Sequence, residues 1–177
     1  MERKEILRNL IVYFTFKVPN ITPTKLIKLI YLADLLHYEK HRRKISNVEF
    51  FNYHYGPWHP IIELTVMKEC GELVEIKSVQ TRKGEVIKIH KPKVEEATIS
   101  FPSEGIFDTL KAVVNKWGNV NTDKIVKYIK NRSPFIETCK GQIIDFTFLD
   151  PEFKESIKRA SNQAKEGHVN LKSTDDL

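Results

Sequence analysis

The stretch "TPTKLIKLIYLADLLHYEKH", residues 22–41, predicts the central helix of the fold. Thr22 and Pro23 are typical of a helix start, because the hydroxyl can cap free amides and proline suits the first turn. Apolar residues follow at helical spacing: Leu26, Ile27, Leu29, Ile30, Leu32, Ala33 and Leu36. Because this helix is apolar on nearly all sides, other elements must cover several of its sides.

Further helices are expected on both sides of this stretch. Apolar periodicity, capping residues and glycine or proline stops predict helices at residues 3–16, 60–70, 104–117 and 122–131. Asp150 and Pro151 predict the start of a last helix, with one apolar face formed by Phe153, Ile157, Ala160 and Ala164.

Two regions favour strands. Residues 48–55 are rich in aromatic and β-branched types, and we expect Gly56 and Pro57 to end this short extended segment. Residues 72–79 and 85–91 are strand-like and flank a turn with a glycine, which predicts a hairpin. Helices followed by a hairpin are compatible with a winged-helix-like connectivity.

The fold class expected from these elements is α+β. A chain of 177 residues with 41% hydrophobic and 29% charged residues has the composition of a globular protein with one buried core. We expect a mostly helical single domain over residues 1–164 with a small antiparallel β element, and a polar tail over residues 165–177. No apolar run approaches the roughly 20 residues that span a bilayer, so we expect a cytoplasmic protein.

The residues able to do chemistry form no catalytic or cofactor motif. His37 and His41 have the i, i+4 spacing of a metal pair, but no third ligand accompanies them, and we interpret them as solvated histidines at a helix end. Cys70 and Cys139 are far apart in the sequence and are expected to be inert thiols. We therefore expect a protein that is not an enzyme and that needs no metal or cofactor.

Two blocks of the sequence resemble the Panacea, or SocA-like antitoxin, family. The first joins the turn Tyr55-Gly56-Pro57 to a helix motif made of Lys25, Leu26, Lys28, Leu29, Tyr31, Ala33 and Asp34. The second is "WGNVNTDKIVKYIKNRSPF", residues 117–135. The resemblance implies a mostly helical domain that neutralises a cognate toxin by direct contact. One lineage of the family hands its toxin to a protease, and other relatives are described as phage-associated.

The sequence departs from the family pattern at two places that bear on partner binding. A basic run at residues 40–44 stands where a glycine is usual, and Trp58 stands where an aliphatic residue is common. Trp58, His59, Arg42 and Arg43 are our candidate partner-binding residues, because aromatic and arginine side chains carry much of the energy at protein interfaces. Tyr55 is expected either to join this set or to pack against the central helix.

Asp34 is unusual because it interrupts an otherwise apolar helix. A buried carboxylate needs hydrogen-bond partners. We expect Asp34 to accept bonds from a neighbouring backbone segment or from the Tyr55 turn.

Nucleic-acid binding is the alternative to protein–protein contact. The net charge is +6 and the pI is about 9.2, and one helix has a basic stripe formed by Lys124, Lys127, Lys130 and Arg132. A lysine stripe is most often a solvated face, and otherwise suits an acidic protein or phosphates. Against base reading, the expected helix at residues 60–70 carries only Glu63, Lys68 and Glu69 as charges.

Overall fold

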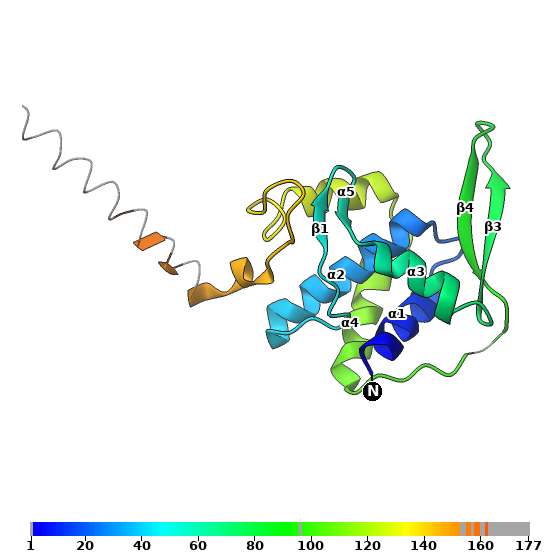
Figure 1. The fold of residues 1–177 in the computed structure, drawn as a ribbon, viewed down its shortest axis with the longest axis horizontal. Helices are drawn as coiled ribbons and strands as arrows, with labels where there is room; N and C mark the ends of the chain where they lie inside the picture. The colour runs from blue at the N-terminus through cyan, green and yellow to red at the C-terminus, as the bar shows by residue number, and fades with distance from the viewer. Residues whose placement is uncertain (1, 96, 153–154, 157, 160–161, 163–177) are drawn as a thin grey trace, which may run out of the picture.

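The computed structural model describes residues 2–95, 97–152, 155–156, 158–159 and 162 (Figure 1). These residues fold as an α+β domain of helices with two small antiparallel sheets. The elements in chain order are α1 (Arg3–Lys17), α2 (Pro23–His41), β1 (Phe51–Tyr53), β2 (Gly56–Trp58), α3 (Pro60–Glu69), β3 (Val74–Gln80), β4 (Val86–Pro92), α4 (Glu104–Trp117), α5 (Thr122–Lys130) and the 3-10 helix η1 (Phe146–Leu149).

Helix α2 is the central element, as its sequence predicts. It lies among the other helices in Figure 1 and packs against α1, α4, α5, β2 and η1. Its apolar residues are buried along most of its length. The helix starts as expected, because the Thr22 side chain accepts a hydrogen bond from the Lys25 amide and Pro23 occupies the first turn. The hydrophobic core therefore surrounds one helix, and the other elements are positioned by their contacts with it.

The segment before α3 is a hairpin, and the prediction that Gly56 and Pro57 end a single strand was wrong. Strand β2 pairs antiparallel with β1, with Tyr53 opposite Gly56 and Asn52 opposite Pro57. Gly56 has a φ of +89°, which a glycine adopts at little cost, and this lets the chain reverse after two turn residues. Pro57 lies where an antiparallel pair exchanges no hydrogen bond, so its missing N–H is not needed.

The second hairpin was predicted correctly. Strands β3 and β4 pair along their whole length, from Val74 opposite Pro92 to Gln80 opposite Val86, and they project from the helices (Figure 1). The His90 amide donates to the Ile21 carbonyl, which attaches β4 to the segment between α1 and α2. The chain order places one hairpin between α2 and α3 and the other after α3.

The ends of the domain are only partly described. Pro151 and Glu152 are helical, as expected after Asp150. The expected apolar face of that helix lies outside the described residues, as does the expected tail: Phe153, Ile157, Ala160, Ala164 and residues 165–177. Within the described part of the chain, no helix combines the length and apolarity needed to cross a membrane.

Candidate protein-interaction site

The outward side of the β1–β2 hairpin is lined by aromatic rings. Side chains alternate along a strand, and because Asn52 and Pro57 are buried on one side, Phe51, Tyr53 and Trp58 share the other side. The Phe51 ring stacks on His59 with centroids 5.5 Å apart, and Tyr53 lies 5.7 Å from Trp58. We call Phe51, Tyr53, Trp58 and His59 the aromatic face.

The hairpin is held in place by a buried lysine of α2. Lys28 Nζ donates a hydrogen bond of 2.7 Å to the Pro57 carbonyl, and the Lys28 side chain is 2% exposed. A side chain at Gly56 would meet Lys28 Cε at 3.3 Å, so the turn and the lysine are closely packed. Because Pro57 has no N–H and its carbonyl is occupied, the free edge of β2 is poorly suited to pairing with another strand. A partner that binds at the hairpin would therefore have to contact its side chains.

Lys28 carries its charge in an unfavourable setting. Burial, followed by the positive charge of Lys130, lowers the pKa of Lys28 from 10.5 to about 8. No ion pair joins Lys28 to a carboxylate within the described residues. Its hydrogen bond to the Pro57 carbonyl is therefore the described contact that offsets the burial of this amine.

The other edge of the hairpin is bound to the segment after α5. The Asn52 amide donates to the Gln142 carbonyl, and Asn52 Nδ2 donates to the carbonyls of Phe135 and Thr138. The Ile144 amide adds a bond of 2.7 Å to the Phe50 carbonyl. With Lys28 on one edge and this segment on the other, the aromatic face is presented on a rigid support.

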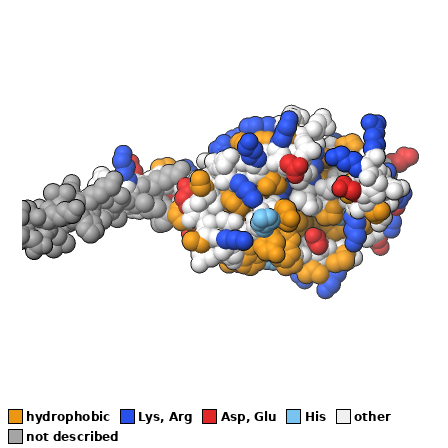
Figure 2. All heavy atoms as spheres, turned by 90° about the horizontal axis from the view of Figure 1, so that it is seen from above, with side chains coloured by type: hydrophobic (Ala, Val, Ile, Leu, Met, Phe, Trp, Pro, Cys, Tyr) orange, Lys and Arg blue, Asp and Glu red, His pale blue; other side chains and the backbone are white. Residues whose placement is uncertain are grey.

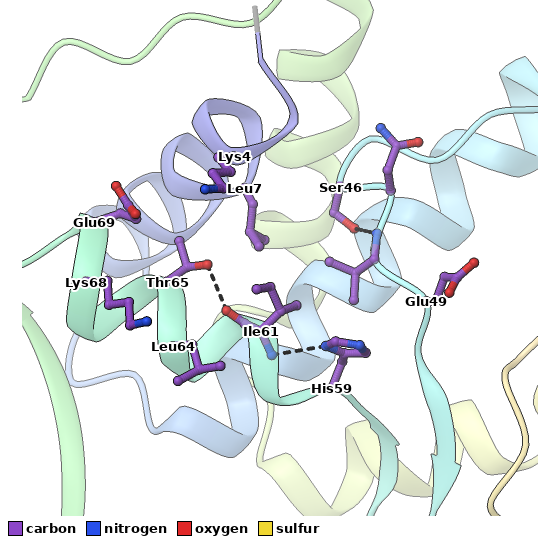
Figure 3. Close-up of a pocket in the computed structure, with 12 residues that line it drawn as sticks. Lys4, Leu7, Ser46, Glu49, His59, Ile61, Leu64, Thr65, Lys68 and Glu69 are labelled. Atoms are coloured by element: carbon purple, nitrogen blue, oxygen red, sulfur yellow. Dashed lines mark hydrogen bonds between the residues drawn. The ribbon is translucent and has the colours of Figure 1, made fainter.

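A groove adjoins the aromatic face. It has a volume of about 550 Å³ and lies between α1, α3 and residues 46–49. Figure 3 shows His59 at its border, with Leu7 of α1 and Ile61 of α3 at the same hollow. The His59 Nδ1 atom accepts a 3.0 Å bond from the Ile61 amide and thereby caps α3. Because His59 belongs to both features, the aromatic face and the groove are continuous.

Asp34 positions the loop that lines this groove. Its carboxylate accepts bonds of 2.8 Å from the amides of Ile45 and Ser46, and a further bond from the Ser46 hydroxyl. Burial raises the pKa of Asp34 to about 6, and the bonds from Ser46 oppose that rise. Asp34 was expected to bond either a neighbouring backbone segment or the turn at Tyr55, and the structure shows the backbone segment. The turn is held by Lys28 instead.

The structure separates the candidate partner-binding residues into two groups. Trp58 and His59 lie together on the aromatic face. Arg42 and Arg43 follow the far end of α2, about 21 Å along the helix from Lys28 at 1.5 Å per residue. Arg42 pairs with Asp150 at 3.3 Å. The two arginines are therefore not part of the site at the hairpin.

Tyr55 does not pack against α2. It is 68% exposed at the tip of the hairpin, with its ring against His54, whereas Trp58 is half-buried and touches the core. Figure 2 views the side that carries α5 and the hairpin turn, where hydrophobic side chains gather next to a histidine and are bordered by lysine and arginine side chains. Tyr55 therefore joins the exposed surface next to the aromatic face.

Two aromatic residues of this face, Phe51 and Tyr53, were not singled out from the sequence. Their alternation with Asn52 is a signal that could have found them, since residues two apart on a strand share a side. That signal was missed because Gly56 and Pro57 were interpreted as a stop and no second strand was expected. The role of Lys28 as an anchor had no local sequence signal.

The lysines of the basic stripe lie on α5, beside β2, whereas Arg132 follows the end of that helix. Lys124 and Lys127 are exposed and Lys130 is half-buried. Arg132 pairs with Glu39 at 3.3 Å and donates to the Tyr128 hydroxyl, so its charge is partly compensated. The stripe therefore consists mainly of the lysines.

The interpretation of both helix-end histidines as solvated was wrong for His37. Its ring is 1% exposed, lies 4.3 Å from the His41 ring, and has Nδ1 at 3.2 Å from the Thr109 hydroxyl oxygen. Burial, and then the charges of His41, Arg43 and Lys40, lower the pKa of His37 to about 4. His41 is exposed, as expected. In the described part of the chain, no three histidine, cysteine or acidic side chains are grouped to hold a metal ion.

The two cysteines occupy different settings. Cys70 is buried at the end of α3, and burial raises the pKa of its thiol to about 11, which disfavours the reactive thiolate. Cys139 is exposed in the segment after α5. Neither thiol lies on the aromatic face or lines the groove.

Comparison with known protein families gives one match. The family described as "Antitoxin SocA-like, Panacea domain" matches residues 26–134, which include most of α2, the whole aromatic face, both hairpins, α3, α4 and α5. Comparisons with curated proteins and with solved structures found no match. Because the family match spans more than half of the sequence, the chain belongs to the SocA-like antitoxin family defined by the Panacea domain.

Proposed function

We propose that this chain is the antitoxin of a toxin–antitoxin pair, and that it neutralises its toxin by direct contact through the aromatic face and the adjoining groove. Membership of the family supports a toxin–antitoxin role and implies a toxin protein as the partner. In this proposal the chain acts in the cytoplasm as a binding protein, without catalysis, metal or cofactor.

The observation that carries the proposal is the exposure of aromatic side chains on a rigid hairpin. Tyr53 is 53% exposed and Tyr55 68% exposed, and the strands beneath them are fixed at both edges. Tyrosine and tryptophan contribute much of the binding energy at protein interfaces. A support that is already ordered loses little conformational entropy on binding.

The outward side of α3 favours a protein partner over nucleic acid. Ile61, Leu64 and Met67 are exposed on it at 38%, 40% and 62%. Helices that read bases present arginine, lysine, asparagine or glutamine to the major groove. The apolar residues of α3 instead extend the surface that the aromatic face and groove offer to a protein.

The experiment is co-expression of the chain with the product of the adjacent reading frame, in cells that this product arrests. The chain is expected to restore growth and to co-purify with the product as one species in size-exclusion chromatography. Tyr53→Ala is expected to weaken both effects, because it removes an exposed ring without opening the core.

The control variant is Lys88→Ala, an exposed residue of the β3–β4 hairpin, which should behave like the wild type. Growth restored without a stable complex would contradict neutralisation by direct contact. A complex that survives Tyr53→Ala, Trp58→Ala and Leu64→Ser unchanged would contradict the assignment of the surface.

A further inference from the structure

A second cavity lies between α2, α4 and α5. It has a volume of about 270 Å³, and its floor includes the buried side chains of Leu32, Leu35 and Val113. Trp117 and Tyr128 form a wall, with ring centroids 4.5 Å apart and ring planes inclined by 49°. The cavity is smaller than the roughly 300–1,000 Å³ of typical small-molecule sites, so its size suits one apolar side chain.

The rim of this cavity is cationic. Lys40, Lys116 and Arg132 line it together with one carboxylate, that of Glu39, which pairs with Arg132 at 3.3 Å. Within the described residues, no ion pair joins Lys40 or Lys116 to an acidic side chain. The Lys116 ammonium lies over both aromatic rings, 5.3 Å from the Trp117 centroid and 5.5 Å from that of Tyr128. The apolar floor is therefore bordered by uncompensated positive charge.

The basic stripe of α5 continues this charge. Lys124 precedes Tyr128 by four residues on α5, so Lys124 lies one helical turn from the cavity wall. Lys127, adjacent to Tyr128 in sequence, is also exposed. An anionic segment leaving the cavity along α5 would meet these lysines in turn.

We propose that this cation-rimmed pocket binds an acidic segment of a protein partner, which inserts one apolar side chain between Leu35 and Val113 and places its carboxylates against Lys40, Lys116 and the α5 lysines. The pocket adds a contact site on α2, α4 and α5 that is distinct from the groove at α1 and α3. That the partner is the toxin rests on the proposed function, whereas the preference for an acidic segment rests on the pocket alone.

A protein segment fits the pocket better than a nucleic acid does. Single-stranded nucleic acids stack their bases on open aromatic faces. Here Trp117 and Tyr128 are inclined to each other, and Arg132 lies 5.0 Å from the Tyr128 centroid, so Lys116 and Arg132 already occupy ring faces. The floor is aliphatic, which suits leucine, methionine or phenylalanine, while the rim suits aspartate and glutamate.

Panning a display library of random peptides on the full-length protein tests the preference without the toxin. We expect the enriched peptides to combine aspartate or glutamate with a leucine, methionine or phenylalanine. Binding of a resynthesised peptide, measured by fluorescence anisotropy, should weaken by about tenfold or more in Lys116→Glu, which reverses a rim charge. Ala112→Trp, at an exposed residue of the rim, should block the cavity with a similar loss and no change of charge.

Lys88→Glu on the β3–β4 hairpin is the matched control, and its peptide affinity should equal that of the wild type. The inference is overturned if no acidic peptide is enriched, or if Lys116→Glu and Ala112→Trp bind as tightly as the control. It is also overturned if an oligothymidylate displaces the peptide with the same sensitivity to both variants, because the surface would then serve nucleic acid.

The acidic end of this sequence, "STDDL", is a competing occupant. If Asp175→Asn combined with Asp176→Asn raises peptide affinity, the pocket is occupied by the chain itself, and the inference of a partner segment fails. A protein that enriches acidic peptides and yet does not restore growth contradicts the proposed function and leaves this inference standing.

Discussion

At the scale of single residues, Lys28 shows how a buried charge can serve a contact surface that it does not touch. Its ammonium holds the carbonyl of Pro57, and this bond fixes the turn that carries the exposed Tyr55. Removing an ammonium from water is costly. The benefit lies in the fixed position of the hairpin, because Lys28 has no carboxylate partner among the described residues.

The burial of the charged Lys28 side chain predicts that the stability of the protein depends on pH. The folded pKa of about 8 is below the unfolded value of 10.5, so between these values the unfolded chain binds more protons, and stability from this group rises with pH. We expect the free energy of unfolding of the wild type, relative to Lys28→Met, to rise by up to about 3 kcal/mol from pH 8 to 10.5. Urea denaturation of both proteins across this range measures it.

The comparison with Lys28→Met is necessary because other titratable groups lower the free energy of unfolding as the pH rises. Burial raises the pKa values of Tyr13, Tyr31 and Cys70, so the folded state holds their protons longer and loses stability at high pH. These contributions are shared by both proteins and cancel in the difference. Parallel stability curves for wild type and variant would contradict the role given to Lys28.

His37 predicts a second pH dependence, at acid pH. Its folded pKa of about 4 is below the ordinary 6.5, so stability from this group is lost as pH falls from 6.5 to 4. Asp34, with a folded pKa raised to about 6, acts oppositely in the same range. We expect the wild type to lose on the order of 1–2 kcal/mol relative to His37→Gln over that interval. Circular-dichroism melts measure the loss, and His54→Gln, an exposed histidine, should track the wild type.

At the scale of elements, local signals placed the helices well. The start of α2 follows from the Thr22 cap and Pro23, and the bounds of α4 agree with its apolar periodicity and with the flanking Ser103 and Gly118, although Ser103 makes no capping bond. These signals act within a few residues of the chain. The β1–β2 hairpin was missed because a proline is tolerated in a strand only where no hydrogen bond to the partner strand is needed. Whether Pro57 occupies such a position depends on the register in which the two strands pair. Register depends on Asn52, which is bonded to a segment more than 80 residues away.

The hairpin turn predicts different effects for two glycines. Gly56 and Gly84 have φ values of +89° and +84°, so alanine is strained at both, by about 1 kcal/mol. At Gly56 the new methyl also meets Lys28 Cε at 3.3 Å, whereas nothing lies within 4 Å at Gly84. We expect Gly56→Ala to lower the free energy of unfolding by about 1 kcal/mol more than Gly84→Ala in chemical denaturation. Equal losses of the free energy of unfolding in the two variants would mean that the Lys28 side chain moves away from the new methyl group without loss of stability.

At the scale of the whole molecule, the candidate site depends on contacts that a linear motif does not encode. The motif residues Lys28 and Asp34 are about one and two-thirds turns apart on α2, yet one fixes the hairpin and the other fixes the loop that lines the groove. Trp58 and His59 could be selected by residue type, and the structure joins them to the same surface. Arg42 and Arg43 satisfy the same chemical criterion, but the length of α2 separates them from it.

The separation of support from surface predicts that stability and binding can be changed independently. Leu64→Ser removes an apolar group that is 40% exposed beside the groove, so we expect the free energy of unfolding to change by about 0.5 kcal/mol or less. Toxin affinity, measured by isothermal titration, should fall at least about tenfold, because the proposed interface would bury the same group in the complex. A large loss of stability with unchanged affinity would place Leu64 in the core and the interface elsewhere.

The pleat of the β1–β2 hairpin has a consequence for how such a protein acquires new partners. Asn52 and Pro57 are buried on the inner side, whereas on the other side Tyr53 is exposed and Phe51 and Trp58 are half-buried. If the proposed function holds, a substitution at an exposed position such as Tyr53 would change the surface offered to a toxin and leave the core unchanged, so the same strand pair could be adapted to a different toxin.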